Sequence, residues 1–138
     1  MRLLYKVGIR VYFFLVLFAS IFNQKARRWL KGRRGMWKKL KSKLPVDKPV
    51  YWIHCSSLGE FEQGRPLIEK IRELSPEVFI LLTFFSPSGY ELRKNYTLAD
   101  HVSYLPLDTR FNAWRFINIV KPTAVFFIKY ELWYYFPR

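Results

Sequence analysis

The sequence contains little cysteine or histidine: one cysteine, Cys55, and two histidines occur among 138 residues. A single thiol cannot form a disulfide within the chain, and zinc sites built from cysteines need several of them. The neighbouring His54 has no further cysteine or histidine at metal-binding spacing, so we expect both residues to be structural and the protein to bind no metal. A lone cysteine also fits a reducing compartment.

Acidic residues are nearly missing from the first third of the chain. Residues 1–48 contain 14 Lys and Arg and one acid, Asp47, whereas residues 49–138 contain ten Lys and Arg and nine acids. The net charge of +14 therefore lies almost entirely in an N-terminal arm that is joined to a nearly neutral region. Such an arm indicates an anionic partner, either a nucleic acid or a membrane surface.

The N-terminal arm also lacks an apolar run long enough to cross a membrane. The stretch VYFFLVLFASIF, from Val11 to Phe22, has 12 residues, whereas a spanning helix needs about 20. It could be a signal peptide, a short signal anchor or a segment that dips into one leaflet. No small-x-small cleavage site follows Ser20, and the ten Lys and Arg between Lys25 and Lys43 favour retention on the cytoplasmic side.

The basic segment after this run is amphipathic if it is helical, although Gly32 and Gly35 weaken a helix there. Its stripe at spacings of three and four consists of Leu30, Arg33, Trp37, Leu40 and Leu44. Tryptophans among basic residues suit an anionic lipid surface, where each Lys or Arg contributes about 1 kcal/mol. We therefore predict that residues 1–48 form a membrane anchor and basic interfacial segment. Nucleic acid is the alternative partner, and the apolar run favours the membrane.

From residue 49 onward, the pattern alternates between strand and helix. Apolar runs predict strands at 50–55, 78–85, 101–106 and 123–130. Helical spacing predicts helices between them, as for Phe111, Trp114, Ile117 and Val120. This order implies an α/β fold with a Rossmann-like parallel sheet. Ligands bind such sheets at the carboxyl ends of the strands, which are followed here by SSLGEFE, SPSGYE, PLDTR and KYELW.

The first two of these segments allow both a structural and a functional interpretation. Ser57 stands three residues before Glu60, which matches a capping box. A carboxylate at this edge of the sheet can also act as a general base. The segment from Ser86 to Gly89 either caps a helix or offers free amides to an anion or a sugar hydroxyl.

Charged residues end the other two strands. Asp108 follows the third strand and is expected to cap the next helix. Lys129 and Glu131 emerge on the same side of the fourth strand, because side chains alternate along a strand with a period of two. They form either an ion pair or part of a site.

Together these motifs resemble the acceptor half of the 3-deoxy-D-manno-octulosonic acid (Kdo) transferases of lipopolysaccharide synthesis. The resemblance covers nearly all of residues 50–135, and it rests on the order and spacing of WIHCSSLGE, PLIEKI, ILLTFFSPSGYE, YLPLD and KPTAVFFIKYELW. The chain differs in having ELWYY where the family pattern has a proline after the tryptophan. The basic, apolar arm agrees with the family's N-terminal membrane anchor.

The resemblance implies the N-terminal half of a two-domain GT-B glycosyltransferase on the cytoplasmic face of the inner membrane of a Gram-negative bacterium. Such an enzyme transfers Kdo from CMP-Kdo to the lipid A precursor, lipid IVA, with inversion and without a metal or other cofactor. Glu60 matches the family's general base. The acceptor cleft would be lined by Ser57, Gly59, Ser86, Ser88, Gly89, Lys129 and Glu131.

The resemblance also implies a donor-binding domain that residues 1–138 do not supply. We therefore expect residues 49–138 to be an incomplete acceptor-side domain and the isolated chain to be inactive. Either the chain is a fragment or the protein is a degenerate relative. The alternative function is a non-catalytic α/β module, tethered to the membrane, that binds an anionic lipid. A basic nucleic-acid-binding protein is the third hypothesis.

Overall fold

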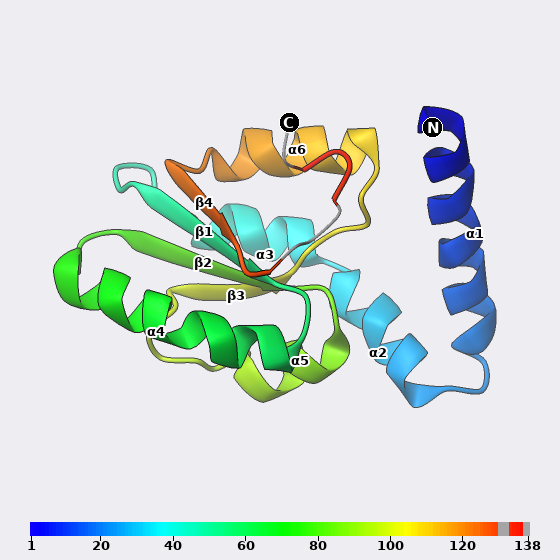
Figure 1. Cartoon of the computed structure of the whole chain (residues 1–138), viewed down its shortest axis with the longest axis horizontal. Helices are drawn as coiled ribbons and strands as arrows, with labels where there is room; N and C mark the ends of the chain where they lie inside the picture. The colour runs from blue at the N-terminus through cyan, green and yellow to red at the C-terminus, as the bar shows by residue number, and fades with distance from the viewer. Residues whose placement is uncertain (130–132, 137–138) are drawn as a thin grey trace.

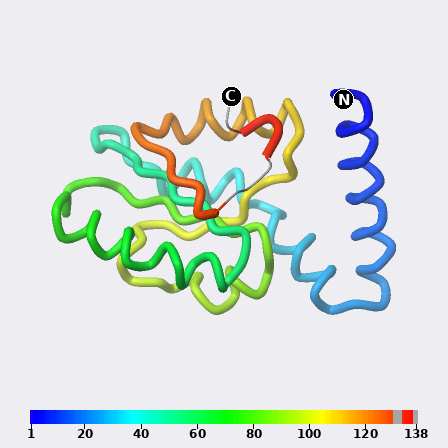
Figure 2. Tube along the Cα trace, in the orientation of Figure 1, coloured from blue at the N-terminus to red at the C-terminus, as the bar shows by residue number. Residues whose placement is uncertain are grey.

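The computed structural model describes residues 1–129 and 133–136, which contain six helices and one four-stranded sheet (Figure 1). Three helices precede the first strand, and strands and helices then alternate along the chain, as the tube trace also shows (Figure 2). In chain order the elements are α1 (Arg2–Ala19), α2 (Gln24–Arg33), α3 (Met36–Lys43), β1 (Val50–Cys55), α4 (Leu58–Leu74), β2 (Phe79–Phe84), α5 (Pro87–Arg93), β3 (His101–Tyr104), α6 (Arg110–Val120) and β4 (Ala124–Phe127).

The sheet is parallel throughout, with the strand order β3-β2-β1-β4. Helices cover both of its faces: α3 and α6 lie on one, and α4 and α5 lie on the other (Figure 1). Successive side chains of β1 enter different halves of the core, since Trp52 packs in the cluster with α3 and α6, and Ile53 in the cluster with α4. The predicted α/β fold with a Rossmann-like parallel sheet is confirmed.

The helix predicted between the third and fourth strands is present as α6, but its largest side chains do not lie on its buried face. Phe111 and Trp114 are each 64% exposed. α6 packs on the sheet through Ala113, Phe116 and Val120 instead. The exposed aromatic side chains therefore remain on the outer surface of α6.

The basic segment is folded into the α/β domain as two helices. α2 and α3 are separated at Gly35, whose φ of +72° is left-handed and favours glycine. Trp29 is buried, and Leu40 is fully buried in the cluster that contains Trp52 and Phe116. Residues 24–43 thus contribute to the core, while membrane attachment of residues 1–48 stays a prediction.

α1 stands beside the α/β domain (Figure 1). None of its residues is buried, and its exposed apolar side chains include those of Leu3, Leu4, Val7, Phe14 and Phe18. No helix in the described part of the chain is by itself long and apolar enough to span a membrane. α1 and α2 together meet that requirement by length and composition alone, as a pair bent by 119°.

We predict that Leu40→Ala lowers the free energy of unfolding by about 2–5 kcal/mol, because it removes a fully buried leucine from the core. Leu92→Ala, at a position of α5 that is 62% exposed, should change it by less than about 0.5 kcal/mol. Urea unfolding followed by circular dichroism measures both values. Equal effects would mean that the basic segment is not part of the domain core.

Candidate functional site

Glu60 lies in the first turn of α4, directly after the carboxyl end of β1. Ser57 is the N-cap of this helix, and its hydroxyl accepts a hydrogen bond from the Glu60 amide at 3.4 Å. In return, the Glu60 carboxylate accepts a hydrogen bond from the Ser56 amide at 2.6 Å. The capping geometry expected from the sequence is present, with the carboxylate reaching one residue further back than in a standard capping box. It also fixes the orientation of the carboxylate.

The loop after β2 lies against the loop after β1. The Ser86 amide donates a hydrogen bond to the Ser56 carbonyl at 2.9 Å. Ser86 is also the N-cap of α5, with Pro87 in the first turn, and its hydroxyl lies 2.7 Å from that of Ser88. Ser56 therefore binds Glu60 through its N–H and Ser86 through its C=O. The structure brings these two predicted segments of the site together.

The two glycines assigned to the cleft differ in what surrounds them. A Cβ at Gly89 would lie 2.4 Å from Cδ1 of Phe84 and 3.2 Å from the backbone nitrogen of Leu58. Glycine is therefore required for α5 to approach the beginning of α4. At Gly59 a Cβ would meet only the Ser57 hydroxyl, at 3.9 Å, so the space there accepts a side chain.

The predicted pair at the end of the fourth strand can be placed only in part. Lys129 is exposed and has a φ of +72°. The residue before it remains attached to the sheet, because the Ile128 amide donates to the His54 carbonyl at 3.0 Å. Glu131 lies outside the described residues.

A buried polar chain runs from the sheet to Ser56, and sequence reasoning did not find it. Trp52 Nε1 donates to Thr83 Oγ1 at 2.8 Å, and the same oxygen lies 2.8 Å from Nδ1 of His54. Nε2 of His54 lies 3.2 Å from the Ser56 hydroxyl. Burial lowers the pKa of His54 to about 3, so the ring is neutral.

These hydrogen bonds join the four side chains in one chain. Because Trp52 can only donate, the Thr83 hydroxyl accepts from it. The neutral ring of His54 then has one donor and one acceptor nitrogen, which contact the hydroxyls of Thr83 and Ser56. The structural role expected for His54 is thus to position the residue that holds Glu60. The signal in the sequence is Thr83, a polar residue inside the apolar run VFILLTFF.

Asp108 does not cap α6, so that expectation is wrong. Thr109 is the N-cap, and its hydroxyl accepts from the Asn112 amide at 3.2 Å. The buried carboxylate of Asp108 accepts instead from the Tyr134 amide at 2.6 Å, from the next amide at 3.1 Å and from the Tyr5 hydroxyl. Burial and the Asp108 carboxylate raise the pKa of Tyr5. Asp108 thereby joins α1 and the segment after β4 to the loop after β3.

Arg33 was expected on an amphipathic surface helix, but its side chain is partly buried and its guanidinium lies beside the site. The guanidinium donates to the carbonyls of Phe85 at 3.0 Å, Leu105 at 3.1 Å and Trp29 at 3.1 Å. It also lies over the Trp29 ring, 3.7 Å from the centroid. Burial lowers the pKa of Arg33 to about 9, so the side chain stays charged at neutral pH. It fixes the residues that follow β2 and β3.

An apolar groove of about 510 Å³ borders the Ser86 loop. Its walls come from the second half of α1, from α2 and from the loop after β2, and they include Leu15, Val16, Trp29, Phe85 and Ser86. Within residues 1–129 and 133–136, no group of three His, Cys, Asp or Glu side chains gathers as possible metal ligands. The site therefore combines a carboxylate, hydroxyls and an adjoining apolar surface.

Comparison with known proteins finds similarity to a family of transferases. A family model described as 3-Deoxy-D-manno-octulosonic-acid transferase (kdotransferase) matches residues 27–137. The chain is 34% identical to the 3-deoxy-D-manno-octulosonic acid transferase of Haemophilus influenzae over 116 residues, which cover 83% of this chain and 26% of that protein. It is 37% identical to the protein of the same name from Aquifex aeolicus over 94 residues, or 67% of this chain and 26% of that protein. The chain thus spans about a quarter of the length of these relatives.

We predict that Gly89→Ala lowers the free energy of unfolding by about 1–3 kcal/mol, because the added methyl group collides with the Phe84 ring and crowds the backbone nitrogen of Leu58. Gly59→Ala should instead leave stability unchanged or raise it by up to about 1 kcal/mol, since alanine favours a helix over glycine. Urea unfolding distinguishes the two outcomes. Equal stability of both variants would contradict the close approach at Gly89.

A pH dependence follows from the buried His54. The pKa of His54 is about 3 in the folded protein and near 6.5 in the unfolded chain. Between pH 3 and pH 6.5, therefore, His54 binds a proton in the unfolded chain but not in the folded protein. The free energy of unfolding should therefore fall as the pH falls from 6.5 toward 3, by up to about 1.4 kcal/mol per pH unit from this group. Comparing the urea unfolding of wild type and His54→Gln between pH 7 and 4 isolates the contribution of His54 to this pH dependence. NMR titration of the His54 ring tests the same pKa directly, and a value near 6.5 would contradict it.

Proposed function

Because the chain belongs to the family of 3-deoxy-D-manno-octulosonic acid transferases, we propose that it forms part of the acceptor-side domain of a GT-B glycosyltransferase. The full-length protein would transfer Kdo from CMP-Kdo to the lipid A precursor, lipid IVA, with inversion at the anomeric carbon. A second domain would bind the CMP moiety, for which the length of the curated relatives leaves room.

The observation that carries this proposal is the meeting of Glu60 and Ser86 at one residue, Ser56. In the proposed reaction, an acceptor hydroxyl oxygen bonds to the anomeric carbon of Kdo. CMP leaves with the electron pair of the broken bond, and the hydroxyl proton passes to the Glu60 carboxylate. The hydrogen bond from the Ser56 amide holds that carboxylate in a fixed position, as a base requires.

The serine loop would bind the acceptor sugar. The hydroxyls of Ser86, the N-cap of α5, and Ser88, in its first turn, lie together, and each can donate and accept a hydrogen bond. Gly89 lets α5 pack directly on the beginning of α4. The N-terminus of α5 is therefore a rigid polar surface next to the segment that carries the proposed base.

The surroundings of this loop suit an acceptor that carries acyl chains. An acyl chain in the groove between α1 and α2 would place its headgroup beside Ser86, which lines the same groove. The exposed apolar side chains of α1 and the basic residues after it favour an anionic membrane. We place the protein on the cytoplasmic face of the inner membrane as part of this proposal.

The hydrogen bond between Glu60 and Ser56 also favours a second candidate function. In a non-catalytic module tethered to the membrane, Glu60 would serve only to cap α4, and the groove would bind an anionic lipid without any transfer. Both functions require the same fold. They differ in whether the basicity of Glu60 is needed.

We predict that Glu60→Gln in the full-length protein lowers the rate of Kdo transfer roughly a hundredfold or more, because a general base is removed. The amide oxygen of glutamine can still accept from Ser56, so the loss of stability should stay near 1 kcal/mol. A radiolabelled transfer assay and thermal melting on one preparation measure both effects. The matched control is Glu62→Gln in the same helix, which removes exposed ion pairs to Arg65 and Arg93 and should keep the wild-type rate.

A folded Glu60→Gln protein with the wild-type rate would show that Glu60 is a helix cap and not a base. Absence of transfer by the wild-type full-length protein, with CMP-Kdo and lipid IVA supplied, would favour the non-catalytic module. Loss of activity in Glu62→Gln as well would indicate a general effect on α4.

A further inference from the structure

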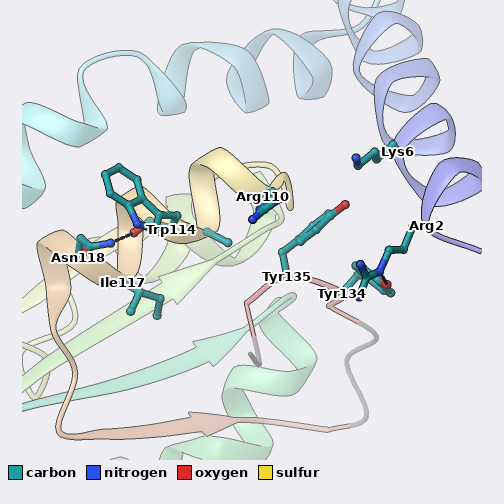
Figure 3. A pocket seen from close by; sticks show the side chains of 9 residues that line it. Arg2, Lys6, Arg110, Trp114, Ile117, Asn118, Tyr134 and Tyr135 are labelled. Carbon is teal, nitrogen blue, oxygen red and sulfur yellow. Dashed lines mark hydrogen bonds between the residues drawn. The ribbon is translucent and has the colours of Figure 1, made fainter.

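A second cavity lies on the other flank of α1, between this helix, α6 and residues 134–135 (Figure 3). Its volume is about 410 Å³. It shares no lining residue with the apolar groove and contains none of the candidate site residues that the structure describes. The cavity therefore needs an explanation separate from sugar transfer.

Three cationic side chains line this cavity. Arg2 and Lys6 come from successive turns of α1, and Arg110 comes from the first turn of α6 (Figure 3). Between described residues, none of the ion pairs includes any of the three. A cation at the first turn of a helix is disfavoured by the helix dipole, so Arg110 does not stabilise the N-terminus of α6. The cavity is thus strongly positive and suited to an anion.

The tyrosines of the cavity provide hydrogen-bonding groups. The Tyr134 hydroxyl accepts from Nε of Arg2 at 3.1 Å, which orients that guanidinium. The Tyr135 hydroxyl is buried and has no hydrogen-bond partner among the described residues. A buried hydroxyl without a partner is costly, and a bound acceptor would satisfy it.

Exposed apolar side chains on the two helices that carry these cations indicate what carries the anion. Leu3, Leu4 and Val7 are exposed on α1. Phe111 and Trp114 are exposed on α6, and the Trp114 side chain also lines the cavity. A free sugar phosphate or a nucleic acid has no use for these apolar side chains, whereas a lipid places acyl chains next to its headgroup. Exposed aromatic side chains beside cations are typical of a membrane interface.

We propose that this cavity binds the phosphate monoester headgroup of an anionic membrane lipid. The phosphate lies between Arg2, Lys6 and Arg110 and accepts a hydrogen bond from the Tyr135 hydroxyl. A monoester fits better than a diester, because its second charge and third terminal oxygen offer more to the three cations and the tyrosine hydroxyl. The bound lipid joins α1 to α6 and so fixes the helix against the domain at the membrane surface.

Vesicle binding tests this site in the full chain. The probes are phosphatidylcholine vesicles that contain either phosphatidic acid, a monoester, or phosphatidylglycerol, a diester, adjusted to equal surface potential. Wild type should bind the phosphatidic acid vesicles about tenfold more tightly, the gain expected from one charge-assisted hydrogen bond. The triple variant Arg2→Gln, Lys6→Gln, Arg110→Gln should lose this preference and still bind both vesicles through α1.

The matched control removes the same charge from exposed positions of α3, as Lys38→Gln, Lys39→Gln, Lys41→Gln. It should weaken binding to both vesicles equally and keep the preference. Tyr135→Phe changes no charge and should reduce the preference several-fold, so it tests the site even if the triple variant does not fold. Equal binding of wild type to both vesicles would overturn the proposal, as would a preference that survives in both cavity variants.

This inference rests on the membrane attachment proposed above and not on the transfer reaction. Binding of wild type to phosphatidylglycerol vesicles shows whether the protein attaches to an anionic membrane. The preference for phosphatidic acid shows whether the cavity binds the headgroup. Kdo transfer is measured separately with Glu60→Gln. Failure of one measurement is therefore distinguishable from failure of the others.

Discussion

The buried guanidinium of Arg33 is the interaction on which the arrangement of the site depends. It satisfies the carbonyls of Phe85 and Leu105, which follow two neighbouring strands, and it joins both to α2. Removing a charge from water costs free energy. Hydrogen bonds to three carbonyls and cation–π contacts with the rings of Trp29 and Tyr104 offset this cost for Arg33. If α2 left the domain, these carbonyls would lose their donor. The loop that carries Ser86 therefore depends on a segment whose composition alone suggests a surface arm.

Much of the fold could be predicted from local chemistry. Runs of β-forming residues gave the strands, and the Ser86-Pro87 pair gave the beginning of α5, because a cap and a fixed proline φ act within one turn. The position of Glu60 followed in the same way from its spacing to Ser57. What these features share is that their partners lie within a few residues along the chain.

The features that sequence reasoning missed depend on partners far away in the chain. Arg33 lies 52 residues from Phe85, and Asp108 lies 26 residues from Tyr134, so no local pattern reveals either contact. The same reason explains why α6 hides Ala113 and Phe116 and not its larger aromatic side chains: the face is chosen by the sheet and α3. Ser56 was missed because its role lies in its backbone groups, which every residue possesses.

The contact between Tyr5 and Asp108 has a consequence for the order of events during synthesis. The two residues are 103 positions apart. A ribosome adding about 5–20 residues per second needs roughly 5–20 s to cover that distance. During this interval α1 has emerged from the ribosome and Asp108 has not. The leucine and phenylalanine side chains of α1 therefore have no domain to pack against. A bilayer or a targeting factor that is present at this stage would therefore meet the helix before the domain assembles against it.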